Sequence, residues 1–430
     1  MKAELLHLIP QLEQTQYLEQ DKIDQIINQE LGLLLRHHRQ HSPHFAKRLA
    51  AQGLRASEIA TVEGLKQLKP FNKRDLQAAG DDFITRSVPK THLPVGEAQT
   101  SGSTGTPVTI RKNRITNLFW HAYVIRDHQW WKRDYKSKMT AIRFLEGFRE
   151  SDQWGGPVSM LYGSGPAQGI PVNTDIATQM AMINKFQPNI MIVHAGVLSA
   201  FVTEWERTGY TLTELKHLKN LGDTVHDTLR DRFRALSGLE IEDGYSSSEV
   251  GCISIQCPEG GLHHIMRENL IVEILKEDDS PCAVGEIGRV VVTDIHNSAA
   301  PIIRYDMGDW AELGPTCSCG RPGMTLRRVL GRERGMFVSA NGSKFWPTAG
   351  QRKLAEKWNV LQWQIIQHSL EDIEYKLVVD YDPTEEQLAE IRAWCNEQLG
   401  FKDAVRLTLL KDYIPTPAGK YEESICLIKS

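Results

Sequence analysis

The chain has 430 residues, which exceeds the usual size of one domain and predicts at least two. Lys and Arg number 50 and Asp and Glu 54, a net charge of −4, so composition does not indicate binding to nucleic acid or to a membrane surface. The N-terminus carries early acids, and the longest near-apolar run, residues 190–202, is too short to span a bilayer. We therefore expect a cytoplasmic protein.

Residues 1 to about 90 are expected to be mostly helical. Ile23, Ile27 and Leu31 recur at helical spacing across a charged background. Histidines close this stretch at positions 37, 38, 41 and 44. Because no acid or cysteine lies among them, we interpret them as the solvated end of a helix rather than as a metal site.

Between about residues 100 and 300, short β-type runs alternate with helical patterns, which predicts an α/β architecture. These runs include residues 190–193, 270–275 and 289–293. The last hundred residues show a strand pattern, a helix pattern ending at Gly400 and a second strand pattern, typical of a small ββαβ-type domain.

The expected fold class is thus α/β, with a large N-terminal α/β domain and a small C-terminal α+β domain. A hinge is predicted around Gly331–Gly335. The predicted domains are therefore residues 1–331 and residues 332–430.

The strongest local signal is a run rich in glycine and hydroxyl residues, TSGSTGTP, over residues 100–107. Its glycines let the backbone approach a ligand closely, and its hydroxyls add hydrogen-bond donors. Such a loop can wrap a polyphosphate, although it lacks the Gly-Lys-Ser/Thr of a Walker loop. Taken alone, the run is also compatible with a flexible polar linker.

Four further elements follow along the chain. Glu249 comes after a turn of small residues, where its carboxylate could hold the magnesium ion that accompanies ATP. Asp309 follows a β-type run and could accept hydrogen bonds from ribose hydroxyls. Gly331 and Arg332 come next. Finally, Lys420 stands on a glycine-containing tip, where it could neutralise charge growing on a carboxylate and an α-phosphate.

These five elements, in this order, resemble the adenylate-forming superfamily of acyl-CoA synthetases, adenylation domains and luciferases. The short chain and the runs HSPHF, GEIGRVVVTD, PIIRYDMGD and CSCGR are similar to its phenylacetate-CoA ligase branch. The resemblance implies that ATP activates a small carboxylic acid, aryl or aryl-like, to an acyl-adenylate with release of pyrophosphate. Coenzyme A then takes the acyl group as a thioester and AMP leaves, while the mobile C-terminal domain rotates between the two steps.

The same resemblance assigns site residues. The expected catalytic residues are Lys420 as the adenylation lysine, Glu249 as the Mg²⁺ ligand, and Thr104. The expected nucleotide-binding residues form the phosphate loop, an adenine-facing turn, the adenine and ribose contacts, and a position near the hinge: Thr100, Ser101, Gly102, Ser103, Gly105, Thr106, Gly222, Asp223, Thr224, Tyr245, Ser246, Asp309 and Arg332.

A second group of residues, three cysteines and one histidine, is expected to bind a structural zinc ion. The chain has seven cysteines, an odd number, which does not indicate a disulfide framework. Three thiolates and one imidazole suit tetrahedral Zn²⁺, and Cys257, Cys317 and Cys319 supply the thiolates. The resemblance to the branch's Cys…Gly-Leu-His…Cys-x-Cys pattern assigns the imidazole to His263 rather than His264. The alternative is four unrelated residues in turns.

The chain departs from the family pattern after the hinge. Arg334 stands where Asp or Lys is usual, and the loop at residues 342–347 lacks the Ile-Glu that normally follows it. The acceptor therefore stays open between coenzyme A, the phosphopantetheine of an acyl carrier protein, and an amine. A non-catalytic protein that binds a nucleotide or an acyl-adenylate is a further alternative, and a homodimer is also left open.

Aromatic residues follow the phosphate loop at Trp120, Tyr123, Trp130 and Trp131. They could line a pocket for an aryl acid or belong to the core, and the sequence does not separate these hypotheses. His194 follows a β-type run, where pocket residues can lie.

Overall fold

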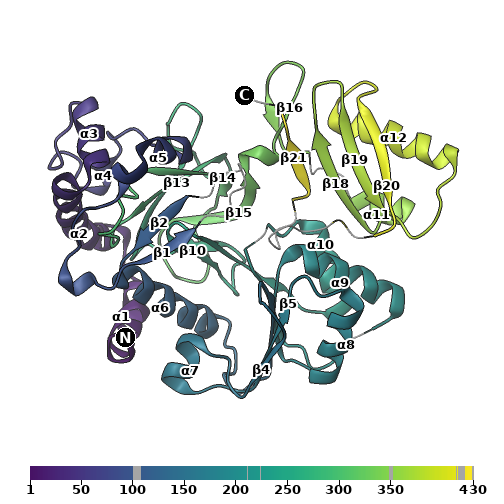
Figure 1. Cartoon of the computed structure of the whole chain (residues 1–430), viewed down its shortest axis with the longest axis horizontal. Coiled ribbons are helices and arrows are strands. Elements are labelled where there is room, and N and C mark those ends of the chain that lie inside the picture. Colours follow the sequence, from purple (N-terminus) through teal and green to yellow (C-terminus); the bar gives the residue numbers. More distant parts are fainter. Residues whose placement is uncertain are drawn as a thin grey trace. The chain divides into compact units, whose positions relative to one another are not determined.

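The computed structural model describes residues 1–99, 108–210, 212–222, 224–347, 352–412, 414 and 422–428. These residues form two compact units. The first unit comprises Met1–Ser137, Asp152–Gly165 and Asp243–Leu330, and the second comprises Lys138–Ser151, Pro166–Glu242 and Gly331–Ser430. The protein is α/β, with a large N-terminal and a smaller C-terminal domain (Figure 1). Because the second unit combines stretches from both predicted domains, the boundary between residues 331 and 332 stays a prediction.

The N-terminal stretch of the first unit is helical, as predicted. Ile23, Ile27 and Leu31 lie on the buried face of α2 and pack against Ile271 of the neighbouring sheet. The helical elements of this unit are α1 (Lys2–Thr15), α2 (Gln20–His41), α3 (Pro43–Ala51), α4 (Val62–Leu65), α5 (Lys73–Ala79), η1 (Gly80–Phe83), η2 (Lys90–His92), α6 (Arg114–Trp130) and α7 (Gly156–Tyr162). Figure 1 shows α2, α3, α4 and α5 gathered beside β13.

His38 corrects the prediction of a solvated histidine cluster. Its side chain is fully buried, its Nε2 lies 3.0 Å from the carbonyl oxygen of Asn297, and its Nδ1 lies 3.2 Å from Thr85 Oγ1. Burial lowers the pKa of His38 to about 3. It is therefore a neutral core residue that satisfies backbone and hydroxyl groups.

The first unit contains a sheet with the strand order β12-β13-β14-β15-β11-β10-β9. Its strands are β9 (Gly244–Ser247), β10 (Gly251–Gln256), β11 (His263–Ile265), β12 (Leu270–Leu275), β13 (Ile287–Asp294), β14 (Tyr305–Leu313) and β15 (Thr325–Arg332). β12 and β14 both pair antiparallel with β13. The runs at 270–275 and 289–293 are therefore strands, as predicted, but of an antiparallel meander. Both strands are buried on both faces, which gives them the continuous apolar character usual in parallel sheets.

The second unit contains a largely parallel sheet with the order β4-β5-β3-β6-β7-β8. Its elements are β3 (Met139–Arg143), β4 (Arg149–Ser151), β5 (Ala167–Pro171), α8 (Ile176–Phe186), β6 (Ile190–Val193), α9 (Ala195–Thr208), β7 (His217–Asn220), α10 (Asp227–Ser237) and β8 (Ile241–Glu242). Figure 1 shows α8, α9 and α10 together beside this sheet. The alternation of strands and helices predicted for the middle of the chain is confirmed over this region.

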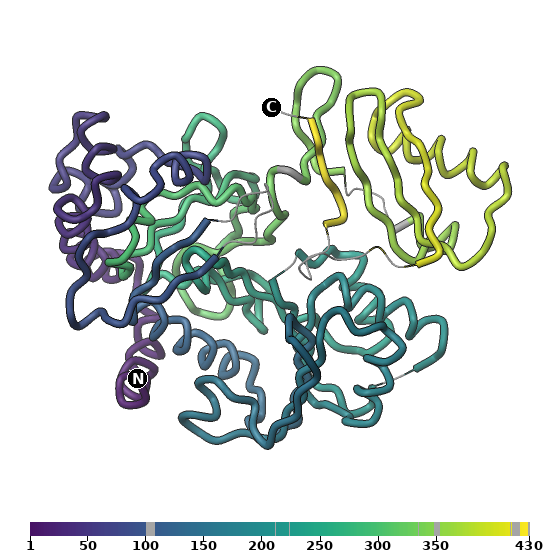
Figure 2. Tube along the Cα trace, in the orientation of Figure 1, coloured from purple at the N-terminus to yellow at the C-terminus, as the bar shows by residue number. Residues whose placement is uncertain are grey.

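The C-terminal region forms a separate sheet with the order β20-β19-β18-β21 and its own core. Its elements are η3 (Glu333–Gly335), β16 (Phe337–Val338), β17 (Lys344–Phe345), α11 (Arg352–Trp358), β18 (Gln362–Gln367), β19 (Ile373–Val378), α12 (Glu385–Leu399), β20 (Val405–Leu410) and β21 (Ser424–Cys426). The predicted ββαβ order is confirmed. Figure 2 shows the yellow trace of β21 beside the green trace of β18, with which it pairs in parallel.

Local signals account for the ends of α12. Thr384 and Gln387 form a reciprocal capping box at its start, and Gly400 adopts φ +69° at its end, a left-handed conformation that glycine takes without steric cost. None of the helices in the described ranges combines the length and the apolar character needed to cross a membrane.

Candidate functional site

The predicted phosphate loop, Thr100–Pro107, lies outside the described residues, as do Asp223 and Lys420. The strands that flank the loop are β1 (Gly96–Gln99) and β2 (Thr109–Lys112), which pair antiparallel with Gln99 opposite Thr109. The roles assigned to Lys420, Asp223 and the loop residues stay predictions: Thr100, Ser101, Gly102, Ser103, Thr104, Gly105 and Thr106.

Tyr245 and Asp309, predicted to lie at adenine and ribose, meet in the first unit. The phenol of Tyr245 on β9 donates a hydrogen bond of 2.6 Å to Asp309 Oδ2 on β14. Both residues are buried, at 9% and 7% exposure. A hydrogen bond to an ionised group is short and directional, so it fixes the orientation of the carboxylate. A carboxylate held in this way can accept hydrogen bonds from a diol.

Glu249 lies in the turn between β9 and β10 and is 5% exposed. Ser246 precedes it on β9, and Ser247 Oγ accepts the N–H of Val250 at 3.2 Å, which fixes the turn. The Glu249 carboxylate is therefore presented from a constrained backbone. Its predicted role as a magnesium ligand stays a prediction.

Lys112 on β2 belongs to none of the predicted motifs, but its charge interacts with that of Glu249. Burial lowers the pKa of Lys112, and the negative charges of Asp294 and Glu249 oppose that shift. Asp294 is itself buried, which raises its pKa to about 6, and its Oδ1 accepts the backbone N–H groups of His296 and Asn297. No sequence signal marks Lys112, because Lys112 on β2, Asp294 on β13 and Glu249 in the turn after β9 are distant in sequence, and only tertiary packing brings their charges together.

In the second unit, residues at the carboxyl ends of the parallel strands come together. Gly222 follows β7 with φ +75°, and a Cβ on it would lie 3.9 Å from Cε1 of His194, which follows β6. The ring of Phe144, which follows β3, lies 6.2 Å from the His194 ring in an edge-to-face arrangement and is 54% exposed. Ligands of open parallel sheets bind at this edge, and an aromatic ring with an imidazole offers a flat apolar wall.

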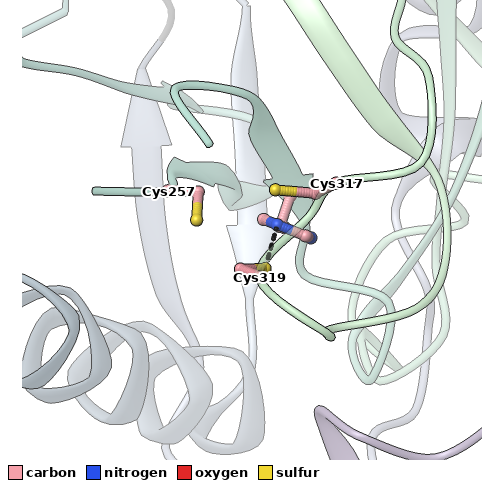
Figure 3. A group of neighbouring side chains, drawn as sticks. Cys257, Cys317 and Cys319 are labelled. Atoms are coloured by element: carbon pink, nitrogen blue, oxygen red, sulfur yellow. Dashed lines mark hydrogen bonds between the residues drawn. The ribbon is translucent and has the colours of Figure 1, made fainter. Parts of the chain in front are cut away.

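Cys257, His264, Cys317 and Cys319 bring their donor atoms within 4.8 Å of one another in the first unit. Figure 3 shows the three cysteine side chains converging, and its dashed line marks the 3.3 Å contact between Cys319 Sγ and His264 Nε2. Donors this close can share one ion with ligand bonds of about 2.0–2.3 Å. The cluster joins the end of β10, the strand β11 and the loop between β14 and β15.

The predicted histidine of this cluster was wrong: the structure places His264 there instead of His263. Successive side chains of a strand point to opposite faces, so only one of two adjacent histidines on β11 can face the cysteines. His263 faces the other way, with Nδ1 3.3 Å from Ser254 Oγ. Burial, together with Arg321 and Arg267, lowers the pKa of His264 to about 4, so its imidazole is neutral near pH 7, as a metal ligand must be.

The surroundings of the cluster are tightly built. A Cβ on Gly260 would lie 2.4 Å from Cys317 Sγ, so only glycine allows this approach. The Arg321 guanidinium stacks 4.3 Å from the Trp130 ring centroid and lies 3.9 Å from Cys257 Sγ. A cation beside thiolates would offset part of their negative charge.

Comparisons of sequence and of fold both find proteins named as coenzyme A ligases. The chain is 23% identical over 346 residues to the phenylacetate-coenzyme A ligase of Thermus thermophilus, covering 77% of this chain and 75% of that relative. It is 20% identical over 412 residues to Protein CapK of Staphylococcus aureus, covering 91% and 86%. Its fold matches 2-hydroxyisobutyryl-CoA ligase in complex with R3-HIB-AMP, with TM-score 0.73, 15% identity and coverage of 95% and 90%.

The chain is related to the phenylacetate-CoA ligase branch of the adenylate-forming superfamily. The resemblance drawn from its motifs is thereby confirmed. No protein-family model matches the chain.

The predicted hinge of this chain begins at Gly331, whose backbone makes close contacts. Gly331 adopts φ +111°, and a Cβ on it would lie 3.3 Å from Thr224 Oγ1 and 3.7 Å from the Trp346 ring. Thr224 and the segment entering Arg332, both predicted at the nucleotide, are thus neighbours in the second unit. The close approach and the positive φ together explain why glycine occupies position 331.

The aromatic residues after the phosphate loop were predicted either to line a pocket or to belong to the core. Tyr123 and Trp130 are 1% and 8% exposed and belong to the core between α1 and α6, with Trp131 packed against it. Trp120 is 39% exposed. Packing therefore explains Tyr123, Trp130 and Trp131 without a ligand. Phe144, which no predicted motif contains, lies instead at the sheet edge where a ligand would bind.

Proposed function

We propose that this protein is an AMP-forming acid–thiol ligase that activates a carboxylic acid with ATP and transfers the acyl group to coenzyme A. The observation that carries the proposal is the similarity to phenylacetate-CoA ligases over 77% of the chain. The order of the five motifs and the hydrogen-bonded Tyr245–Asp309 pair support it.

In the first step, a carboxylate oxygen attacks the α-phosphorus of ATP, the bond from that phosphorus to the oxygen bridging to the β-phosphate breaks, and pyrophosphate leaves. Residues 100–106 bind the phosphates, and Asp309, oriented by Tyr245, holds the ribose. Lys420 neutralises charge on the attacking and phosphate oxygens. Catalysis therefore consists of positioning and charge neutralisation. A magnesium ion held by Glu249 would supply further neutralisation of the phosphates.

In the second step, a thiolate attacks the acyl carbon of the adenylate, a carbon–sulfur bond forms, and AMP leaves with the anhydride oxygen. The His194–Phe144 edge favours a planar, aryl or aryl-like acid. The altered loop at residues 342–347 favours one variant of this function, in which a carrier-protein phosphopantetheine or an amine replaces coenzyme A. A cytoplasmic location and a homodimer stay predictions.

The experiment that tests this function measures pyrophosphate release from ATP with a panel of aryl and alkyl carboxylic acids, with and without coenzyme A. We expect release to depend on an aryl acid and AMP formation to rise when coenzyme A is added. Acid-dependent release with no coenzyme A effect would indicate a carrier or amine acceptor. An absence of release with every acid would contradict the proposal.

Tyr245→Phe is expected to raise the KM for ATP about tenfold, because a hydrogen bond to a charged group typically contributes about 1.5–3 kcal/mol. Steady-state kinetics with ATP as the varied substrate measures this effect. Tyr381→Phe is the matched control, since its hydroxyl donates a hydrogen bond of equal length, 2.6 Å, to the Trp358 carbonyl in the C-terminal domain. Equal KM changes in the two variants would argue against a nucleotide role for Tyr245.

We further propose that Cys257, His264, Cys317 and Cys319 hold a structural zinc ion. Such an ion would join the loop between β14 and β15 to β10 and β11, and would supply cross-linking rather than catalysis. The residues fit because one neutral imidazole and three sulfur atoms converge in a buried site.

Metal analysis of the purified protein tests this site. We expect about one zinc ion per chain, and His264→Ala should lose most of it and lower the midpoint of thermal unfolding. His263→Ala, the adjacent control on the opposite face of β11, should keep its zinc. Retention of zinc by His264→Ala with loss in His263→Ala would reverse the assignment.

A further inference from the structure

A carboxylate from the C-terminal sheet meets an imidazole at the start of α10, within the second unit. His226 Nε2 lies 2.7 Å from Glu423 Oε2. Glu423 immediately precedes β21, and its carbonyl oxygen accepts the N–H of Ile365 on β18 at 2.8 Å. His226 precedes α10, whose Phe233 packs into the core of the parallel sheet. The pair therefore connects two substructures that each have their own core.

The two oxygens of Glu423 have different kinds of partner. Oε1 accepts the indole N–H of Trp363 at 2.6 Å, and Trp363 belongs to the same sheet as Glu423. Oε2 faces His226, which belongs to the other substructure. The Glu423 side chain is 9% exposed, whereas that of His226 is 37% exposed. If the two substructures separated, Glu423 Oε1 would keep the hydrogen bond from Trp363, and only Oε2 would return to water. This ion pair is therefore able to open.

One neighbouring contact between the same substructures, among the residues that the structure describes, is uncharged. Thr203 Oγ1 on α9 lies 3.4 Å from the carbonyl oxygen of Leu361, just before β18. Contacts of this kind do not change between pH 5 and 8, whereas an imidazole does. The His226–Glu423 pair therefore adds a contribution to this junction that depends on the proton of His226.

The charges around the pair favour the ionised state. Burial lowers the pKa of His226, but the charge and hydrogen bond of Glu423, with help from Asp227 and against Arg230, raise it overall. Burial raises the pKa of Glu423, but His226 and Trp363 lower it overall. A raised histidine pKa means that the link is fully present below the ordinary imidazole pKa and is lost as pH rises through the raised value.

We propose that His226 and Glu423 form a latch that positions the C-terminal sheet on α10 for the adenylation step. This inference rests on the proposed function, because Lys420 stands three residues before Glu423 and would act in that step alone. One proton lost from His226 removes the attraction without breaking the core on either side. The pair is therefore a positioning device that can be released between the two half-reactions.

Hydrogen–deuterium exchange of the full chain, between about pH 6 and about pH 9, tests the latch without any substrate. After correction for intrinsic exchange, we expect β21 and the first turn of α10 to lose protection together as pH rises. His226→Ala should raise exchange of both segments about fivefold at the acidic end, as expected for loss of a partly exposed ion pair. His226→Gln keeps a donor but cannot titrate, so its protection should not change with pH.

His217→Gln is the matched control. His217 Nδ1 lies 2.5 Å from Glu242 Oε1, and this pair lies entirely within the parallel sheet. The control should retain the wild-type pH dependence at β21. Wild-type protection of β21 that does not change with pH, or His226→Ala exchange equal to wild type, would overturn the latch.

A kinetic comparison separates positioning from general stability. With phenylacetic acid as the probe, His226→Ala should lower kcat for ATP–pyrophosphate exchange about fivefold with little change in the KM for ATP. Thioester formation from supplied phenylacetyl-adenylate should not slow. Equal losses in both steps would overturn the positioning role. An absence of wild-type exchange with this acid would count against the proposed function, and hydrogen exchange would still decide the latch.

Discussion

Lys420→Ala is expected to lower the rate of adenylate formation by about 10²-fold or more while leaving ATP binding largely intact. The ammonium group would neutralise charge that grows between the acid and the α-phosphate, and this charge is greatest in the transition state. In the proposed function, binding of ATP depends instead on the phosphate loop, Glu249 and Asp309. Acid-dependent ATP–pyrophosphate exchange measures the first quantity, and equilibrium titration with ATP measures the second.

Lys411→Ala provides the control for this variant. Lys411 is also a C-terminal lysine, but its Nζ lies 2.6 Å from Asp382 and its side chain is 60% exposed. We expect its exchange rate to match wild type. Near-normal pyrophosphate release from the Lys420→Ala protein would remove this lysine from the proposed mechanism.

Arg126→Met is expected to destabilise the protein by about 3–5 kcal/mol, the usual cost of leaving one member of a buried ion pair without its partner. Arg126 Nη2 lies 2.8 Å from Glu268 Oε1, and the two side chains are 6% and 8% exposed. The same guanidinium donates a hydrogen bond of 2.6 Å to the Leu12 carbonyl and so connects α1 to α6. The midpoint of urea-induced unfolding measures the change.

Arg234→Met is the matched control for the buried pair. Arg234 lies 2.5 Å from Glu240, but these side chains are 47% and 55% exposed, so we expect a change of about 0–1 kcal/mol. Comparable destabilisation in the two variants would contradict the role given to burial. The double variant Arg126→Met/Glu268→Leu should recover much of the stability, because it removes both members of the buried pair.

The buried Arg126–Glu268 pair also predicts how the stability of the protein depends on pH. Burial raises the pKa of Glu268, but the charge and hydrogen bonds of Arg126 lower it overall. A lowered carboxyl pKa means that the contribution to stability is present above the ordinary carboxyl pKa and is lost as pH falls through the lowered value. The difference in unfolding midpoint between wild type and Arg126→Met should therefore shrink in acid.

Sequence reasoning reached the family because its motifs are local. The phosphate-loop run, Glu249, Asp309 and Lys420 each stand in a short segment whose residue types suit one chemical task, and their order along the chain adds the specificity that each segment lacks. The C-terminal ββαβ order was predicted for a similar reason. Alternation of period two and a helix closed by Gly400 are visible in consecutive residues.

Only the tertiary structure showed which side chains of a strand face a site and whether neighbouring strands are parallel or antiparallel. His263 and His264 differ by one position, and only the register of β11 against β10 and β15 determines which imidazole faces the cysteines. The strands at 270–275 and 289–293 show the same limit, since burial of both faces removes the pattern that distinguishes antiparallel from parallel strands.

By itself, the sequence determined the family, the fold class and the residues expected to bind ATP, because these depend on residue type and order along the chain. Only the tertiary structure showed that Glu249 lies within reach of the charge of Lys112, that His264 completes the cysteine cluster, and that His226 meets Glu423. Each of these pairings joins strands, helices or loops that are distant in sequence. Their meeting depends on strand register and packing, which no local pattern encodes.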